Sequence, residues 1–113
     1  MENWLKQYVI LLLQQNNIKT ENIIIFFVSG EMAYTNRGRD VVGVETVHCE
    51  IQLSPQSKSF DRLVFARIFK MKEIEINQTK ILQKYIGFKR EDLDISESHS
   101  LIIMVDFTYD VKE

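Results

Sequence analysis

Residues 47–53 read VHCEIQL and residues 103–111 read IMVDFTYDV, and in both segments apolar and polar side chains alternate. A period of two residues is typical of a β-strand that buries one side and exposes the other. The two segments therefore predict strands of a sheet with one buried face. The side chains predicted on that face are Val47, Cys49, Ile51, Leu53, Ile103, Val105, Phe107, Tyr109 and Val111.

Two segments show the helical spacing of apolar residues and are predicted to pack on that sheet. Over Asn3–Asn16, apolar residues recur three and four positions apart. Ser59 suits the start of a second helix over Phe60–Lys72, whose broad apolar stripe predicts burial on two sides. A third, short helix is predicted over Asn77–Ile86, with Gly87 as its C-terminal stop.

The remaining segments predict a further strand and three connections. Ile23–Val28 is an unbroken apolar run, which predicts a central strand covered on both faces. Ser29-Gly30 predicts a turn, and Glu31–Thr35 a short return strand. Asn36–Asp40 is polar and contains a glycine, which predicts a mobile loop, and Lys89–Ser100 predicts a hairpin or loop.

These elements predict one α+β domain over residues 1–113. Its mainly antiparallel sheet is expected to carry two longer helices packed on one face and one short helix. With 45% hydrophobic residues, the chain can fill a core of its own.

Charge and cysteine content exclude several classes of function. The net charge is −2 and the pI is near 5.7, which argues against nucleic-acid partners, because phosphates require a clustered basic face. The apolar run Tyr8–Leu13 is too short to span a membrane. Cys49 is the only cysteine, which excludes an intramolecular disulfide and a thiolate zinc site and predicts a cytoplasmic compartment.

The sequence contains no recognisable catalytic motif. His48 and His99 lack the spacing of a metal site, and four glycines are few for a loop that binds phosphate. Asp40 with Glu50 shares part of the acid plus E-x-K pattern of metal-dependent nucleases, but Gln52 stands where the lysine belongs. We therefore predict no enzyme activity, no catalytic or metal-binding residues and no cofactor.

Candidate interface residues lie in the polar loop and on the second helix. The loop arginines flank Gly38, where their forked donors can bind carboxylates of a partner, although a solvated loop is the alternative. The two phenylalanines widen the helix stripe, which is expected to pack on the first helix or on a neighbouring subunit. The candidate residues are Tyr34, Arg37, Arg39, Asp40, Phe65 and Phe69.

From Val44 onward, about two thirds of the chain, the predicted elements follow a distinctive order. They are the strand Val44–Leu53, the turn Ser54-Pro55, a helix with FDRL at 60–63 and ARIF at 66–69, a short helix over Thr79–Tyr85, GFKRED at 87–92, and a closing strand ending in FTYDV at 107–111. This order, with a helix before it, resembles the tail terminator and tail completion proteins of long-tailed bacteriophages and phage-like particles.

The resemblance implies a non-enzymatic structural protein of a phage or prophage tail. Such proteins form rings, often hexameric, that terminate the tail tube and join it to the head connector. The implied partners are further copies of the chain, the tail tube protein and the head–tail connector protein, first in the bacterial host cytoplasm and then in the virion tail. A cyclic ring uses a heterologous interface that closes on rotation. A small cytoplasmic dimeric binding or regulatory module remains the alternative.

Overall fold

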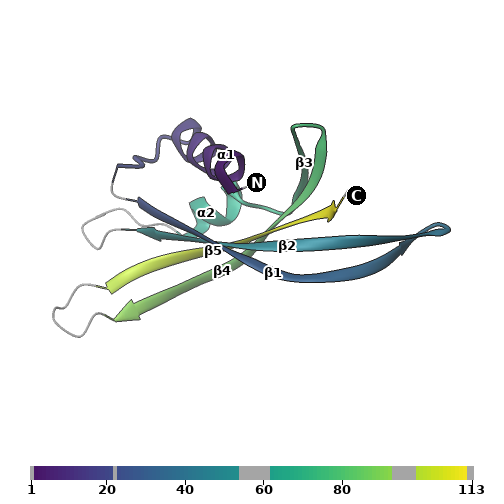
Figure 1. Ribbon diagram of the computed structural model, residues 1–113. Helices are drawn as coiled ribbons and strands as arrows, with labels where there is room; N and C mark the ends of the chain where they lie inside the picture. The colour runs from purple at the N-terminus through teal and green to yellow at the C-terminus, as the bar shows by residue number, and fades with distance from the viewer. Residues whose placement is uncertain (1, 22, 54–61, 93–98, 112–113) are drawn as a thin grey trace.

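The computed structural model describes residues 2–21, 23–53, 62–92 and 99–111 (Figure 1). The strands form one antiparallel sheet in the order β1-β2-β5-β4-β3, so the predicted α+β class with a mainly antiparallel sheet is confirmed. The elements are α1 (Glu2–Gln15), β1 (Ile23–Arg37), β2 (Asp40–Leu53), α2 (Arg62–Ile68), β3 (Lys72–Ile76), β4 (Thr79–Asp92) and β5 (His99–Val111).

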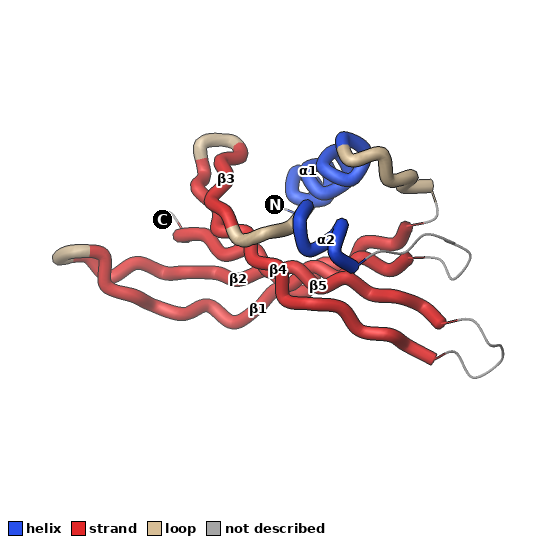
Figure 2. Tube along the Cα trace, turned by 180° about the vertical axis from the view of Figure 1, so that it is seen from behind, coloured by secondary structure: helices blue, strands red, loops and turns tan. Residues whose placement is uncertain are grey.

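Both helices lie on the same side of the sheet (Figures 1 and 2). Leu5, Val9 and Leu13 recur along one face of α1 and are fully buried in the core between helix and sheet. β2 and β5 are neighbours, with Cys49 opposite Val105. Of the nine side chains predicted on the buried face, all but the half-buried Val111 at the strand end are buried.

β1 corrects the prediction for Ile23–Val28. It is an edge strand that pairs with β2, and its alternate residues Ile24, Phe26 and Val28 are exposed on the side away from the helices. An unbroken apolar run is typical of a strand covered on both faces, but an edge strand that remains open can have the same composition.

The turn predicted at Ser29-Gly30 is also wrong, because β1 continues to Arg37 with a bulge between Ser29 and Met32. A Cβ atom at Gly30 would collide with the carbonyl oxygen of Thr46. Glycine here therefore permits the close backbone approach of an irregular strand, without a reversal of the chain.

Two tight hairpins replace the predicted loop and the predicted third helix. The segment expected to be a mobile loop is a turn at Gly38 and Arg39, flanked by the paired residues Arg37 and Asp40. Asn77 and Gln78 have φ angles of 51° and 66° and connect β3 to β4, so the short helix over Asn77–Ile86 is wrong. Two left-handed residues form the turn that matches the twist of a β-hairpin.

The other boundaries differ from the predictions by varying amounts. α1 lies within one residue of the predicted Asn3–Asn16, whereas α2 ends at Ile68, and β3 already begins at Lys72. The proposed cap Ser59 and the stop at Ser54-Pro55 lie outside the described residues. Much of Lys89–Ser100 is strand, because β4 runs to Asp92 and β5 starts at His99.

Candidate interaction surface

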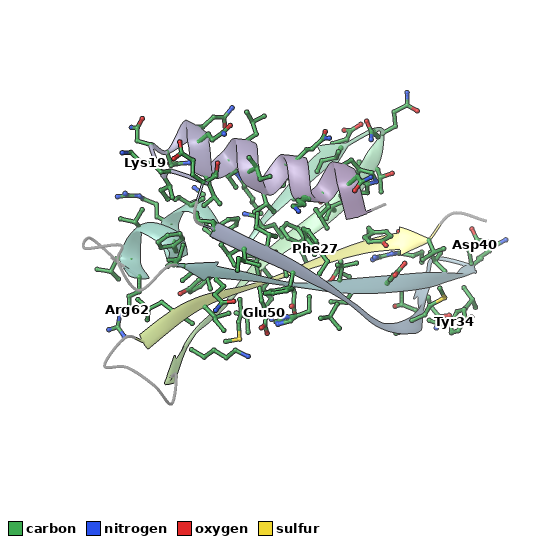
Figure 3. All side chains as sticks on the ribbon, turned by 60° about the vertical axis from the view of Figure 1, so that its left-hand side comes forward. Lys19, Phe27, Tyr34, Asp40, Glu50 and Arg62 are labelled. Carbon is green, nitrogen blue, oxygen red and sulfur yellow. The ribbon has the colours of Figure 1, made fainter. Side chains whose placement is uncertain are left out.

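The side of the sheet away from the helices, which we call the open face, carries a charged centre and an apolar margin. Figure 3 shows Phe27 on the side of α1 and Glu50 on the opposite side. The side chains that form the open face on β1, β2, β5 and β4 include Ile24, Phe26, Val28, Thr46, His48, Glu50, Met104, Asp106, Thr108, Lys84 and Lys89.

The centre is a chain of ionic contacts across three strands, which we call the His48 cluster: Lys89, Glu50, His48 and Asp106. The distance from His48 Nδ1 to Asp106 Oδ1 is 2.6 Å, and the distance from His48 Nε2 to Glu50 Oε2 is 2.9 Å. Lys89 Nζ lies 3.4 Å from Glu50 Oε1. The cluster therefore connects β2 to β5 and β4 on the solvent side of the sheet.

The charges of the cluster stabilise one another. Partial burial lowers the pKa of His48, but hydrogen bonds and negative charge from Asp106 and Glu50 outweigh burial and raise it overall. Burial raises the pKa of Glu50, but its hydrogen bonds to His48 and Lys89 and their charges lower it overall. His48 and Glu50 are therefore stabilised in their charged forms, as imidazolium and carboxylate.

This geometry is unsuited to proton transfer or nucleophilic attack. Both imidazole nitrogens of His48 are engaged by carboxylates, so neither is available to accept a substrate proton. The nearby hydroxyls of Thr46 and Thr108 lie 3.0 Å apart and bond to each other. Cys49 lies on the covered face, where burial raises its pKa to about 12 and disfavours the nucleophilic thiolate.

The nuclease-like acids do not come together. Asp40 and Glu50 lie at the two ends of β2, ten residues apart in one strand, which separates them by about 33 Å. Among the described residues, no group of three or more His, Cys, Asp or Glu side chains could hold a metal ion. The fold therefore does not bring together Asp40 and Glu50, the two acids of the nuclease-like pattern.

The margin of the open face is a row of three apolar side chains on β1, which we call the β1 row. Ile24 is 51%, Phe26 50% and Val28 57% exposed. On the other side of β1, Ile25 and Phe27 are only half-buried against the core. Over Ile23–Val28, β1 is thus apolar on both sides and ends the sheet, and an exposed apolar edge of this kind is a site for pairing with another strand.

The opposite edge of the sheet has a different character. β3 is five residues long and alternates charged and apolar side chains. Glu73 and Glu75 are exposed, while Ile74 and Ile76 pack against the core. A short, charged edge strand resists pairing with other chains, so β1 is the edge suited to association.

The structure separates the six candidate interface residues into two groups. Tyr34 and Asp40 lie at the far end of the β1–β2 hairpin (Figure 3), where Tyr34 is 73% exposed. Arg37 is exposed and contacts Asp110 of its own chain at 3.2 Å, and Arg39 is exposed in the turn.

Phe65 and Phe69 correct the prediction of a helix interface. Both are buried in the core, at 5% and 0% exposure, because α2 packs on the sheet. Their burial within the chain leaves neither side chain exposed to a neighbouring subunit.

A hollow of about 330 Å³ is lined by Arg37, which flanks the turn of the β1–β2 hairpin, and by residues of β3, β4 and β5. Its lining combines both signs of charge, and Arg37 and Asp110 already pair within it. It therefore presents no single charge to a ligand. Its lining residues are Arg37, Glu73, Lys80, Leu82, Thr108, Tyr109 and Asp110.

Comparison of the chain with protein-family models, curated proteins and solved structures finds no match. Neither described helix has the length and apolar character needed to cross a membrane.

Proposed function

We propose that this chain is a non-enzymatic assembly protein that acts by associating with further copies of itself. The observation that carries the proposal is the edge strand β1, whose exposed β1 row has none of the charges that protect β3. Soluble proteins rarely leave such an edge open without a partner. The His48 cluster, with both imidazole nitrogens engaged, supports a structural role for the polar centre of the face.

The specific form of this proposal is the phage-tail function implied by the order of elements. The chain would form a hexameric ring that terminates the tail tube and joins it to the head connector. The strands Val44–Leu53 and 103–111 and the helix between them support the resemblance, whereas Thr79–Tyr85 lies in β4 and does not. The exposed hairpin end at Tyr34 and Arg39 would contact the tail tube or connector.

A dimeric binding module is the second candidate, because the β1 row is symmetric about Phe26 and suits pairing between two copies. This module would use the edge for dimerisation and leave the hairpin for its ligand.

The mass in solution tests both candidates. A ring of six 13.4 kDa chains is expected at about 80 kDa and a dimer at about 27 kDa by light scattering. A tail-assembly assay then tests the specific form, since a terminator should cap the growing tail tube and allow it to join the head connector. A chain that stays monomeric at high concentration, and also in the presence of tail tubes, would refute self-association.

A further inference from the structure

We infer that β1 pairs in antiparallel orientation with β1 of a second copy, across a two-fold axis through Phe26, and joins two five-stranded sheets into one. The inference rests on the proposed self-association. It adds the contact, its register and its symmetry.

The backbone of β1 is suited to such pairing. Alternate residues of an edge strand direct their N–H and C=O groups away from the sheet, where a second strand can bind them. Protected edges carry charges, prolines or bulges. Ile23–Val28 contains neither a charge nor a proline, and the bulge begins only at Ser29, so six residues form a regular unprotected edge.

The spacing of the β1 row determines the register. When two copies are joined by an axis perpendicular to the sheet, their open faces remain on one side, so residues of like parity face each other. With the axis at Phe26, this residue faces its own counterpart, Ile24 faces Val28 of the second copy, and Ile25 faces Phe27. Each of these side chains then meets an apolar partner.

The charge pattern favours a second copy of β1 over the other edge of the same protein. Pairing of β1 with β3 would place the charged side chains of Glu73 and Glu75 beside the apolar β1 row, and such charges disfavour pairing at an edge. A second β1 brings no charge over Ile23–Val28. The carboxylate of Glu50, which lies opposite Phe26, is already paired with His48 and Lys89 and does not oppose the approach.

The contact is expected to be reversible. Five facing residue pairs bury less than the roughly 800 Å² per partner of a standard interface, so the pair should dissociate on dilution. A charged side chain introduced into the β1 row should weaken the contact between the two copies further. We expect Phe26→Lys to raise the dissociation constant of the pair by about tenfold or more.

Disulfide trapping tests the register directly. In the inferred pair the two copies of residue 26 have Cα atoms about 4.5–5.5 Å apart, within the range of a disulfide. Phe26→Cys should therefore give a covalent dimer under mild oxidation. Ile24→Cys alone should not, because its two copies lie about 13 Å apart. The double variant Ile24→Cys/Val28→Cys should again give a covalent dimer, because residue 24 of one copy faces residue 28 of the other. The wild type is the negative control, because its single cysteine, Cys49, is buried.

Sedimentation or light scattering over a range of concentrations supplies the second test. Phe26→Lys should dissociate at higher concentration than the wild type, whereas Leu11→Lys, a control at a similarly exposed site on α1, should behave as the wild type. An oligomeric wild type in which Phe26→Cys is not trapped and Phe26→Lys has no effect would overturn the β1 contact but not self-association. A wild type that is monomeric throughout, also with tail tubes, would overturn both. A two-fold pair is not the heterologous contact of a cyclic ring. Trapping at 26 within a hexamer would therefore support the β1 contact, as three such pairs related by dihedral symmetry, and would exclude a purely cyclic ring.

Discussion

The covered and open faces of the sheet are built from alternate residues of the same strands but are stabilised in different ways. On the covered face of β2 and β5, Cys49, Ile51 and Val105 are fully buried beneath the helices. On the open face, His48 and Asp106 remain partly exposed and are held by charge pairing. Burial of apolar side chains contributes most of the stability of a domain, while exposed ion pairs contribute little. The open face can therefore vary in composition, and can bind a partner, at little cost to the fold.

Gln83 on the covered face and the β1 row on the open face depart from this pattern. On the covered face Gln83 is fully buried, and it accepts a hydrogen bond from the Tyr8 hydroxyl at 2.8 Å and donates one to the Lys70 carbonyl at 3.1 Å. On the open face the β1 row is apolar yet exposed. The buried polar group has partners within the chain, whereas the exposed apolar group has its proposed partner in a second copy.

The largest expected effect is a charge on the covered face. Ile51→Asp or Val105→Asp places a carboxylate in the core without a partner and should cost several kcal/mol, comparable to the whole stability of a small domain. Denaturation followed by circular dichroism should show an unfolded chain. Glu50→Ala, one residue away on the open face, should cost about 1 kcal/mol or less. An Ile51→Asp variant with the melting temperature of the wild type would refute the contrast between the faces.

A smaller effect is expected from the polar exception of the covered face. Tyr8→Phe removes the donor to Gln83 Oε1 and leaves a buried acceptor without its bond, which should destabilise the fold by about 1–3 kcal/mol. Urea denaturation measures the loss. Tyr34→Phe is the matched control, because Tyr34 is exposed and its stability change should be near zero. Equal changes for the two variants would mean that the Tyr8 hydrogen bond contributes nothing to stability.

The ion pairs of the open face should appear as a modest pH dependence. Because the folded pKa of His48 is raised, its stabilisation is full below its ordinary value of 6.5 and is lost as the pH rises through the folded value. The lowered pKa of Glu50 acts oppositely, with stabilisation present above its ordinary 4.5. The contribution of the cluster should therefore be greatest between pH 4.5 and 6.5.

The variant His48→Gln isolates the contribution of His48 to the pH dependence of stability, because it keeps the other histidine, His99. The variant should lack the fall in unfolding free energy that is expected of the wild type as the pH rises above 6.5, a difference of about 1 kcal/mol or less. Denaturant titrations at several pH values measure it. Parallel pH profiles for the two proteins would exclude the His48 cluster as a source of stability.

The smallest effect on stability is expected at the end of the hairpin. Arg37→Glu with Arg39→Glu breaks only the exposed pair with Asp110 and should change the unfolding free energy by about 1 kcal/mol or less. Under the proposed function it should nevertheless block tail joining, because reversed charge meets the carboxylates of the partner. Lys6→Glu with Lys19→Glu, an equal charge change at exposed positions, should assemble normally. Normal assembly of the arginine variant would remove the hairpin end from the interface.

Local patterns predicted the strands at the centre of the sheet and the first helix. Alternation over 47–53 and 103–111 identified the buried side chains, because the pleat itself has a period of two. The stripe of α1 was equally clear, since Leu5, Val9 and Leu13 recur at helical spacing. The helix predicted over Asn77–Ile86 was wrong, because a short apolar segment fits the period of a helix and that of a strand equally well. The left-handed turn at Asn77 and Gln78 makes this segment a β-hairpin.

The sequence by itself determined that residues 47–53 and 103–111 form strands with one apolar side, that α1 is amphipathic, and that the single Cys49 cannot form an intramolecular disulfide. Only the tertiary structure decided that β1 lies at the edge with Phe26 exposed on the uncovered side. It also decided that Phe65 and Phe69 are buried where α2 packs on the sheet. It also brought Lys89 and Asp106 to His48 and Glu50 from distant parts of the chain. The physical reason is that side-chain alternation depends on neighbouring residues alone, whereas exposure and charge pairing depend on the order of strands in the sheet.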